Sequence, residues 1–97
     1  MQSAKLTALW REAGRVSAGL VDGEPYAGPV HIFAHVYKPR AGRYDAGNLY
    51  PTIKAILDGV VDAGLLVDDS NDYVIGPDLR HGGKGPARIV LTVTEIP

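Results

Sequence analysis

The sequence predicts a small α+β domain, a mixed α/β fold in which two helices pack on a small mixed β-sheet. Three observations lead to this prediction: apolar residues recur at helical spacing in two segments, a continuous apolar run separates them, and the C-terminal segment alternates apolar and polar residues. The expected order is helix, strand, helix, strand, strand. A chain of 97 residues suits a single domain spanning 1–97.

The first helix is expected to begin after Ser3, a good N-cap, and to run from about Ala4 to Ser17 or Leu20. Its periodic apolar residues are Leu6, Leu9, Trp10, Ala13 and Val16, and we expect Trp10 to pack in the core. Val30–Tyr37 is apolar on both alternating faces, which favours an interior strand. Pro39 ends this strand, and a basic loop follows as far as Tyr44.

The second helix has the clearest boundaries. Asn48 is a suitable N-cap, Pro51 falls in the first turn, and Gly64 is suited to the position after the helix. The apolar face comprises Ile53, Ile56, Leu57, Val60 and Val61. Lys54, Asp58 and Asp62 are four residues apart, so we expect both aspartates to interact with the lysine along the helix.

The remaining chain is expected to form two strands. A loop at Asp68–Asn71 precedes a short strand, Tyr73–Ile75, and Gly76-Pro77-Asp78 reads as a turn. Arg80–Pro86 is expected to be a glycine-rich basic loop. Ala87–Thr94 alternates strongly and is the last predicted strand.

Composition excludes several classes of function. The chain has no cysteine, so disulfides, thiolate metal sites and cysteine nucleophiles are excluded. No apolar run approaches the roughly 18 residues that a membrane span needs, and no signal peptide is visible, so we expect an intracellular, cytoplasmic protein.

Charge is unevenly distributed, although the formal net charge is only −1. Five aspartates and no base lie between Asp58 and Asp72, and two basic segments flank them. The basic segments contain Lys38, Arg40 and Arg43, and then Arg80, His81, Lys84 and Arg88. They could meet phosphates, or they could be ordinary solvated loops; the sequence leaves both readings open.

The acidic residues suggest a site for a divalent cation beside a phosphate. Asp45 precedes the second helix, Lys54 lies inside it, and the pair Asp68-Asp69 follows it. Oxygen-rich sites prefer Mg²⁺ or Mn²⁺. The alternative is that these aspartates merely form turns and caps. His31 and His35 are about 13 Å apart on one face of a strand, too far to share a metal.

These motifs resemble the RusA family of Holliday-junction resolvases, endonucleases often encoded by phages and prophages. The matching residues are Asp45-Ala46-Gly47-Asn48-Leu49, then Lys54, Asp58, Ala63-Gly64 and Asp68-Asp69, with Gly82-Gly83-Lys84 before the last strand. The resemblance covers nearly the whole chain. It implies a Mg²⁺-dependent, structure-selective endodeoxyribonuclease that resolves four-way or branched DNA junctions in recombination and repair, in the cytoplasm of a bacterial host.

The resemblance also implies roles for individual residues. Asp45 and Asp69 would bind Mg²⁺ (Mn²⁺ is the alternative), Asp68 would assist, and Lys54 would position the scissile phosphate or stabilise the transition state; Asp45, Lys54 and Asp69 are therefore the expected catalytic set. DNA-binding residues would be Lys38, Arg40, Arg43, Asn48, Arg80 and Lys84. Water would attack the phosphodiester directly, without a covalent intermediate, and paired nicking implies a homodimer.

This chain departs from the family pattern at three places. Gly47 stands where the family has a second metal-binding aspartate, about three extra residues lie between Asn48 and Lys54, and the chain begins almost directly in the first helix, which would leave a sheet edge exposed. These differences motivate a second hypothesis, a catalytically weakened RusA-like protein that binds DNA junctions. A third hypothesis is a small interaction module whose aspartates only form turns.

Overall fold

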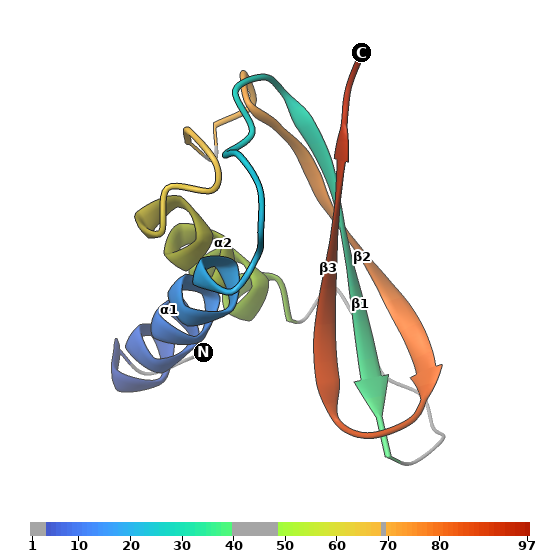
Figure 1. The fold of residues 1–97 in the computed structure, drawn as a ribbon. Coiled ribbons are helices and arrows are strands. Elements are labelled where there is room, and N and C mark those ends of the chain that lie inside the picture. The colour runs from blue at the N-terminus through green and yellow to red at the C-terminus, as the bar shows by residue number, and fades with distance from the viewer. Residues whose placement is uncertain (1–3, 40–48, 69) are drawn as a thin grey trace.

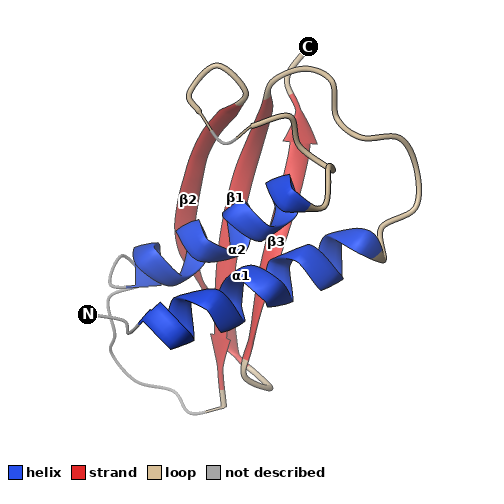
Figure 2. Cartoon of the chain, turned by 90° about the vertical axis from the view of Figure 1, so that its left-hand side faces the viewer, coloured by secondary structure: helices blue, strands red, loops and turns tan. Residues whose placement is uncertain are grey.

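The computed structural model describes residues 4–39, 49–68 and 70–97. These residues form helix α1 (Ala4–Gly19), strand β1 (Val30–Lys38), helix α2 (Tyr50–Asp62), strand β2 (Val74–Lys84) and strand β3 (Arg88–Glu95). Both helices lie on the same face of the sheet, so the described chain has two layers (Figures 1 and 2). The predicted α+β class and the predicted order of elements are therefore confirmed.

The sheet has the strand order β2-β1-β3, with β1 in the centre. β1 and β2 are parallel, and α2 forms the crossover between them, whereas β3 is antiparallel to β1. The connection from β2 to β3 passes the end of β1, where the Gly85 N–H donates a hydrogen bond to the Lys38 carbonyl at 2.8 Å. β1 is thus central in the sheet, as its apolar sequence predicted, and β2 and β3 form the edges of the described sheet.

The core lies between α2 and the inner side of β1. Ile32 and Ile53 are fully buried and Leu57 is 1% exposed, because the apolar stripe of α2 packs directly on β1. Successive side chains of a strand point to opposite faces, so the core-facing residues of β1 are every second one. They are Val30, Ile32, Ala34 and Val36, all buried.

Helix α1 packs on α2 through small residues. A Cβ added to Gly14 would lie 2.1 Å from the Ile56 carbonyl oxygen, and one added to Gly59 would lie 1.9 Å from the Arg11 carbonyl oxygen. The two backbones therefore approach so closely that only glycine fits at the crossing. Trp10 is half-buried and packs against the edge of the core, so the prediction that it joins the core is only partly fulfilled.

The ends of α2 follow the sequence signals in part. Pro51 lies in the first turn, and Gly64, with φ of 83°, follows the helix in a left-handed conformation that glycine adopts without strain. The N-cap is Leu49, which makes no capping hydrogen bond through its side chain. The cap expected at Asn48 is therefore one residue too early, and Asn48 itself lies outside the described residues.

Strand β2 differs most from the prediction. It continues through the Gly76-Pro77-Asp78 segment, expected to be a turn, and through most of the expected basic loop. The register with β1 shifts between His31 and Phe33 and again between Val36 and Tyr37. Such β-bulges allow an edge strand to contain Gly and Pro residues. The prediction of a short strand, Tyr73–Ile75, was thus wrong, because glycine and proline lie at bulges here and do not end the strand.

No helix in the described part of the chain is long and apolar enough to cross a membrane.

Candidate functional site

The proposed metal site falls largely outside the described residues. Asp45 and Asp69 lie there, as do Arg40, Arg43 and Asn48, so the structure does not describe their positions. Asp68 is described and exposed, in the connection between α2 and β2. Within residues 4–39, 49–68 and 70–97, three or more His, Asp or Glu side chains nowhere gather closely enough to hold a metal ion. A metal centre with three or more such ligands would therefore need Asp45 or Asp69.

Lys54 lies near the start of α2 with its side chain 43% exposed. Its Nζ donates a hydrogen bond to Asp58 Oδ1 at 2.9 Å, so the expected pairing one turn along the helix is confirmed. The ammonium is accessible to solvent on one side and held in place on the other. A lysine in this setting can contact an external phosphate while Asp58 limits its rotamers.

Asp62 does not join this pair, contrary to the prediction. It accepts two hydrogen bonds from Arg11 of α1, from Nε at 2.6 Å and from Nη2 at 2.9 Å. These hydrogen bonds hold the pKa of Asp62 below its ordinary value and raise the pKa of Arg11. The pair links the two helices, and sequence spacing could not reveal it because 51 residues separate the partners.

Lys38 and Lys84 are register partners at the end of β1 and β2. The chain continues from β1 into segment 40–48, which contains Asp45, and then enters α2. Two basic residues expected to bind DNA therefore lie side by side where the Asp45 segment begins. Both lysines are exposed, and two neighbouring exposed lysines are suited to contact the phosphates of a nucleic-acid backbone.

Asp68 lies at the opposite end of the sheet from Lys38 and Lys84. Leu66 forms a bridge with Tyr26, just before β1 begins, and the Ser70 carbonyl accepts hydrogen bonds from Tyr73 and Val74, where β2 begins. Figure 1 shows this connection near the start of both strands. The nine residues of β1 span about 26 Å, so the structure does not bring Asp68 together with the two lysines.

Arg80 occupies a third position, on the side of the sheet that faces away from the helices. Its guanidinium carbon lies 5.7 Å from the centre of the Phe33 ring. Arg88 lies in the same way over Tyr37, at 4.3 Å. On this side His31 Nε2 and Asp78 Oδ2 are 2.6 Å apart. We call this side the outer face; it comprises His31, Phe33, His35 and Tyr37 of β1, Ile75, Asp78 and Arg80 of β2, and Arg88, Val90, Thr92 and Thr94 of β3.

The sequence predicts a DNA-binding role for Arg80 but none for the rings of the outer face. The signal was present, because rings recur at every second position from His31 to Tyr37. The same alternation of apolar residues on both faces is what predicts an interior strand. In the structure both described helices lie on the opposite side, and these side chains are only half-buried.

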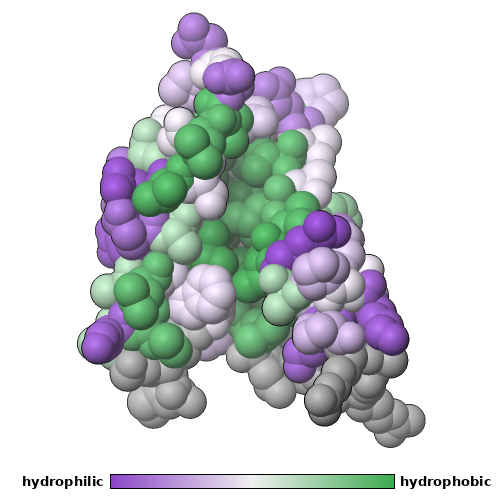
Figure 3. Space-filling view, turned by 60° about the horizontal axis from the view of Figure 1, so that its bottom comes forward, coloured by the Kyte–Doolittle hydropathy of each residue, from purple (hydrophilic) through white to green (hydrophobic). Residues whose placement is uncertain are grey.

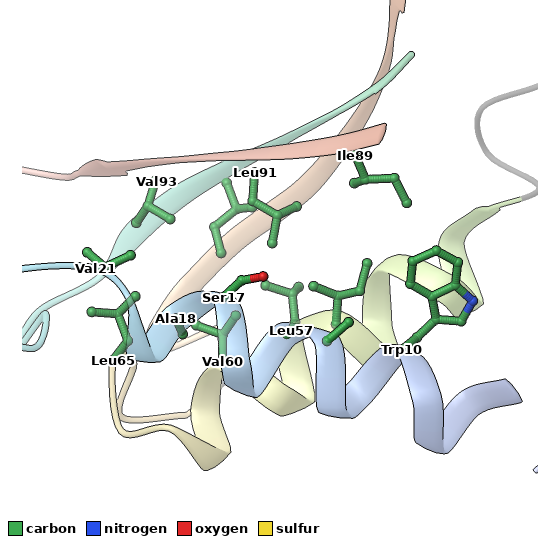
Figure 4. Close-up of a pocket in the computed structure, with 14 residues that line it drawn as sticks. Trp10, Ser17, Ala18, Val21, Leu57, Val60, Leu65, Ile89, Leu91 and Val93 are labelled. Carbon is green, nitrogen blue, oxygen red and sulfur yellow. The ribbon is translucent and has the colours of Figure 1, made fainter. Parts of the chain in front are cut away.

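A separate apolar groove lies between the helices and the inner side of β3. Ile89, Leu91 and Val93 point into it from β3, and Trp10 and Ser17 lie across from them on α1 (Figure 4). Its volume is about 290 Å³, and Figure 3 shows it as a hollow with hydrophobic walls. Its lining contains no charged side chain, and its polar side-chain groups are the Ser17 hydroxyl and the Trp10 indole N–H, so it is an apolar groove without the ligands that Mg²⁺ prefers.

No protein-family model matches the chain, and neither does any curated protein or solved structure.

Proposed function

We propose that the protein is a Mg²⁺-dependent, structure-selective endodeoxyribonuclease of the RusA type that cleaves four-way or branched DNA. The proposal depends on the residue pattern from Asp45 to Asp69 and on its resemblance to that family. From the first helix onward, the order of helices and strands is the one that the resemblance implies.

One observation supports the proposal most directly. β1 ends at Lys38 beside Lys84, and the chain leads from there through the Asp45 segment into the helix that carries Lys54. Two of the lysines expected to bind DNA thus lie where the chain leaves β1, and the sequence between them and Lys54 contains Asp45. Hydrolysis of a phosphodiester needs these groups: acids to hold a cation, and positive charge near the phosphate.

Carboxylate oxygens are the ligands that Mg²⁺ prefers, so Asp45 and Asp69 would hold the ion, assisted by Asp68. Asp68 is exposed but lies at the opposite end of the sheet from Lys38 and Lys84, so these two lysines would contact the DNA away from an ion held with the help of Asp68. When bound, the ion would supply charge that neutralises the phosphate and makes water a better nucleophile.

Lys54 would act on the phosphate and not on the ion. Its ammonium would stabilise the negative charge that develops on the phosphate oxygens, and Asp58 would keep it oriented between turnovers. Lys38, Arg40, Arg43, Arg80 and Lys84 would bind backbone phosphates, which positions DNA without reading its sequence. Asn48 would contact the DNA from the start of α2. Two opposed nicks need two sites, so the active form would be a homodimer with twofold symmetry.

Gly47 supports a second candidate, a RusA-like protein that binds junctions with weakened or no cleavage. Glycine has no side chain to ligate an ion, so the site would have one carboxylate fewer than the family pattern. This candidate predicts salt-sensitive binding to junctions in the absence of nicking.

A labelled synthetic four-way junction and a matched linear duplex, each incubated with the protein with and without Mg²⁺, would test both candidates. Paired nicks in the junction alone, dependent on Mg²⁺, are expected for the nuclease. Binding without nicks would support the weakened relative, and indifference to both DNAs would refute both.

Two variants would test the assigned roles. Asp69→Asn is expected to abolish cleavage and to preserve junction binding, whereas Asp22→Asn, at an exposed loop residue, should leave both unchanged. Lys54→Met is expected to lower the cleavage rate about a hundredfold or more, whereas Lys5→Met on α1 should not. Full cleavage by Asp69→Asn would remove this residue from the metal site.

A further inference from the structure

The outer face is an open surface built around a row of rings. His31 and Phe33 have ring centres 4.3 Å apart in an edge-to-face arrangement, and Phe33 and His35 are 5.9 Å apart. Tyr37 continues the row at the end of β1. Its ring lies over Gly82, where an added Cβ would come within 2.6 Å of the ring. Gly82 therefore leaves room for the Tyr37 ring to lie against the sheet.

Positive charge accompanies these rings. Arg80 lies over Phe33 and Arg88 over Tyr37, both as cation–π contacts, and both arginines are exposed. Of the described residues on the outer face, Asp78 is the single carboxylate, and its oxygen lies 2.6 Å from His31 Nε2. The outer face thus presents two guanidinium groups and partly exposed rings around one carboxylate with a local partner.

The neighbouring residues leave this surface accessible. Thr92 and Thr94 of β3 are register partners of Phe33 and His31, so they lie beside these rings on the same side of the sheet. Both are exposed, as is Val90 beside His35. Val90, Thr92 and Thr94 therefore border His35, Phe33 and His31 with small side chains, whereas Arg88 of β3 lies over Tyr37.

The charges indicate what kind of partner fits. A second copy of the chain, docked face to face, would bring four arginines together around two aspartates. An apolar peptide would leave the guanidinium groups without anionic partners. A strand of nucleic acid supplies both complements, because its phosphates pair with arginines and its unpaired bases stack on rings and guanidinium planes.

We propose that the outer face binds unpaired nucleotides of single-stranded DNA, with bases stacked beside Phe33 and on the guanidinium plane of Arg88 over Tyr37, and with phosphates paired with the N–H edges of Arg80 and Arg88. The choice of DNA over RNA rests on the proposed function, whereas the stacking surface itself does not. In a branched substrate the surface would hold strands that have lost their pairing, and duplex DNA would bind it less tightly because its bases are already stacked.

Fluorescence anisotropy with a labelled oligothymidylate tests this proposal. The titration is carried out in EDTA at low salt, so that neither metal nor cleavage contributes. Phe33→Leu keeps an apolar side chain but removes the ring, and it should weaken binding about tenfold. R80Q/R88Q should weaken binding and lower the slope of log K against log salt by about 1.4, since each phosphate contact on a single strand contributes about 0.7.

The matched control is R11Q/R15Q, which removes the same charge from α1. It should bind the oligonucleotide like the wild type, and thermal unfolding should establish that all variants are folded. Two-dimensional NMR amide shifts should change on β1 and β3 on titration and remain unchanged on α1.

Four results would overturn the proposal. Two concern affinity for the oligothymidylate: no saturable binding by the wild type, or equal losses of affinity in R80Q/R88Q and R11Q/R15Q. The other two are tighter binding of the equivalent RNA, and self-association in sedimentation that Phe33→Leu abolishes. Junction cleavage is measured separately. Cleavage without oligonucleotide binding refutes only the outer-face proposal, and binding without cleavage refutes only the nuclease.

Discussion

Helices α1 and α2 carry apolar residues at similar helical spacing but bury them to very different extents. Ile53 and Leu57 of α2 are 0% and 1% exposed, whereas Leu9 and Val16 of α1 are 58% and 49% exposed. α2 lies against β1, while α1 contacts α2 through Gly14 and Gly59 and leaves its larger apolar residues on the surface. Periodicity therefore indicates that a helix has an apolar face, but the packing decides whether anything covers it.

The largest expected effect comes from truncating the buried helix. Leu57→Ala should lower the free energy of unfolding by about 2–5 kcal/mol, because it removes a fully buried side chain and leaves a cavity. Leu9→Ala, the matched change on α1, should alter it by less than about 0.5 kcal/mol. Urea unfolding of both variants measures the difference. Equal losses would mean that α1 is covered in solution and would remove the contrast between the helices.

The contact between the helices is tested by Gly59→Ala. The new methyl group would overlap the Arg11 carbonyl, so the helices must separate, and the free energy of unfolding should fall by about 1–3 kcal/mol. Gly19→Ala, where nothing lies near the added atom, should instead stabilise the protein by up to about 1 kcal/mol. A stabilised Gly59→Ala variant would show that the crossing tolerates a wider separation.

The polar side of α2 should contribute less to stability. A double-mutant cycle on Lys54 and Asp58 should give an interaction of about 0.3–0.5 kcal/mol, since both side chains are partly exposed and solvent screens the pair. A large loss of junction cleavage in Lys54→Met with this small change in stability would assign the lysine to function. A coupling of several kcal/mol would assign it to the fold.

The smallest effect concerns the Arg11–Asp62 pair between the helices. Hydrogen bonds from Arg11 lower the pKa of Asp62 in the folded state. The pair therefore stabilises the fold at pH values above the pKa of Asp62 in the unfolded chain. This stabilisation is lost as the pH falls through the pKa of Asp62 in the folded protein. The difference in Tm between wild type and Asp62→Asn should therefore be present at neutral pH and disappear in acid. A Tm difference that persists in acid would show that it does not arise from the ionised Asp62 carboxylate.

Local sequence signals predicted much of the fold. The bounds of α1, β1 and β3 agree with prediction to within one or two residues, and the glycine after α2 has the expected left-handed conformation. Signals that depend on context failed. Gly76-Pro77 suggested a turn but lies within β2, and Asp62 was assigned to a neighbour on its own helix when its partner lies on α1.

The candidate site was predictable only in its local parts. The Lys54–Asp58 pair follows from a four-residue spacing on one helix. The proximity of Lys38 and Lys84, and the separation of Asp68 from them, follow from parallel pairing of β1 with β2, which no spacing encodes. The metal-binding roles of Asp45 and Asp69 remain predictions from the residue pattern.

The sequence by itself determined both helices, β1 and β3, and which residues of each are apolar, because these elements have regular apolar periodicity along the chain; β2, which contains Gly and Pro, was defined only by its pairing with β1. Tertiary structure alone decided which apolar face is covered. On β1 the two alternating faces are both rich in apolar or aromatic residues, yet only the one against α2 is buried. The reason is that burial depends on the layer packed against a face, and that layer is supplied by residues far away in the chain.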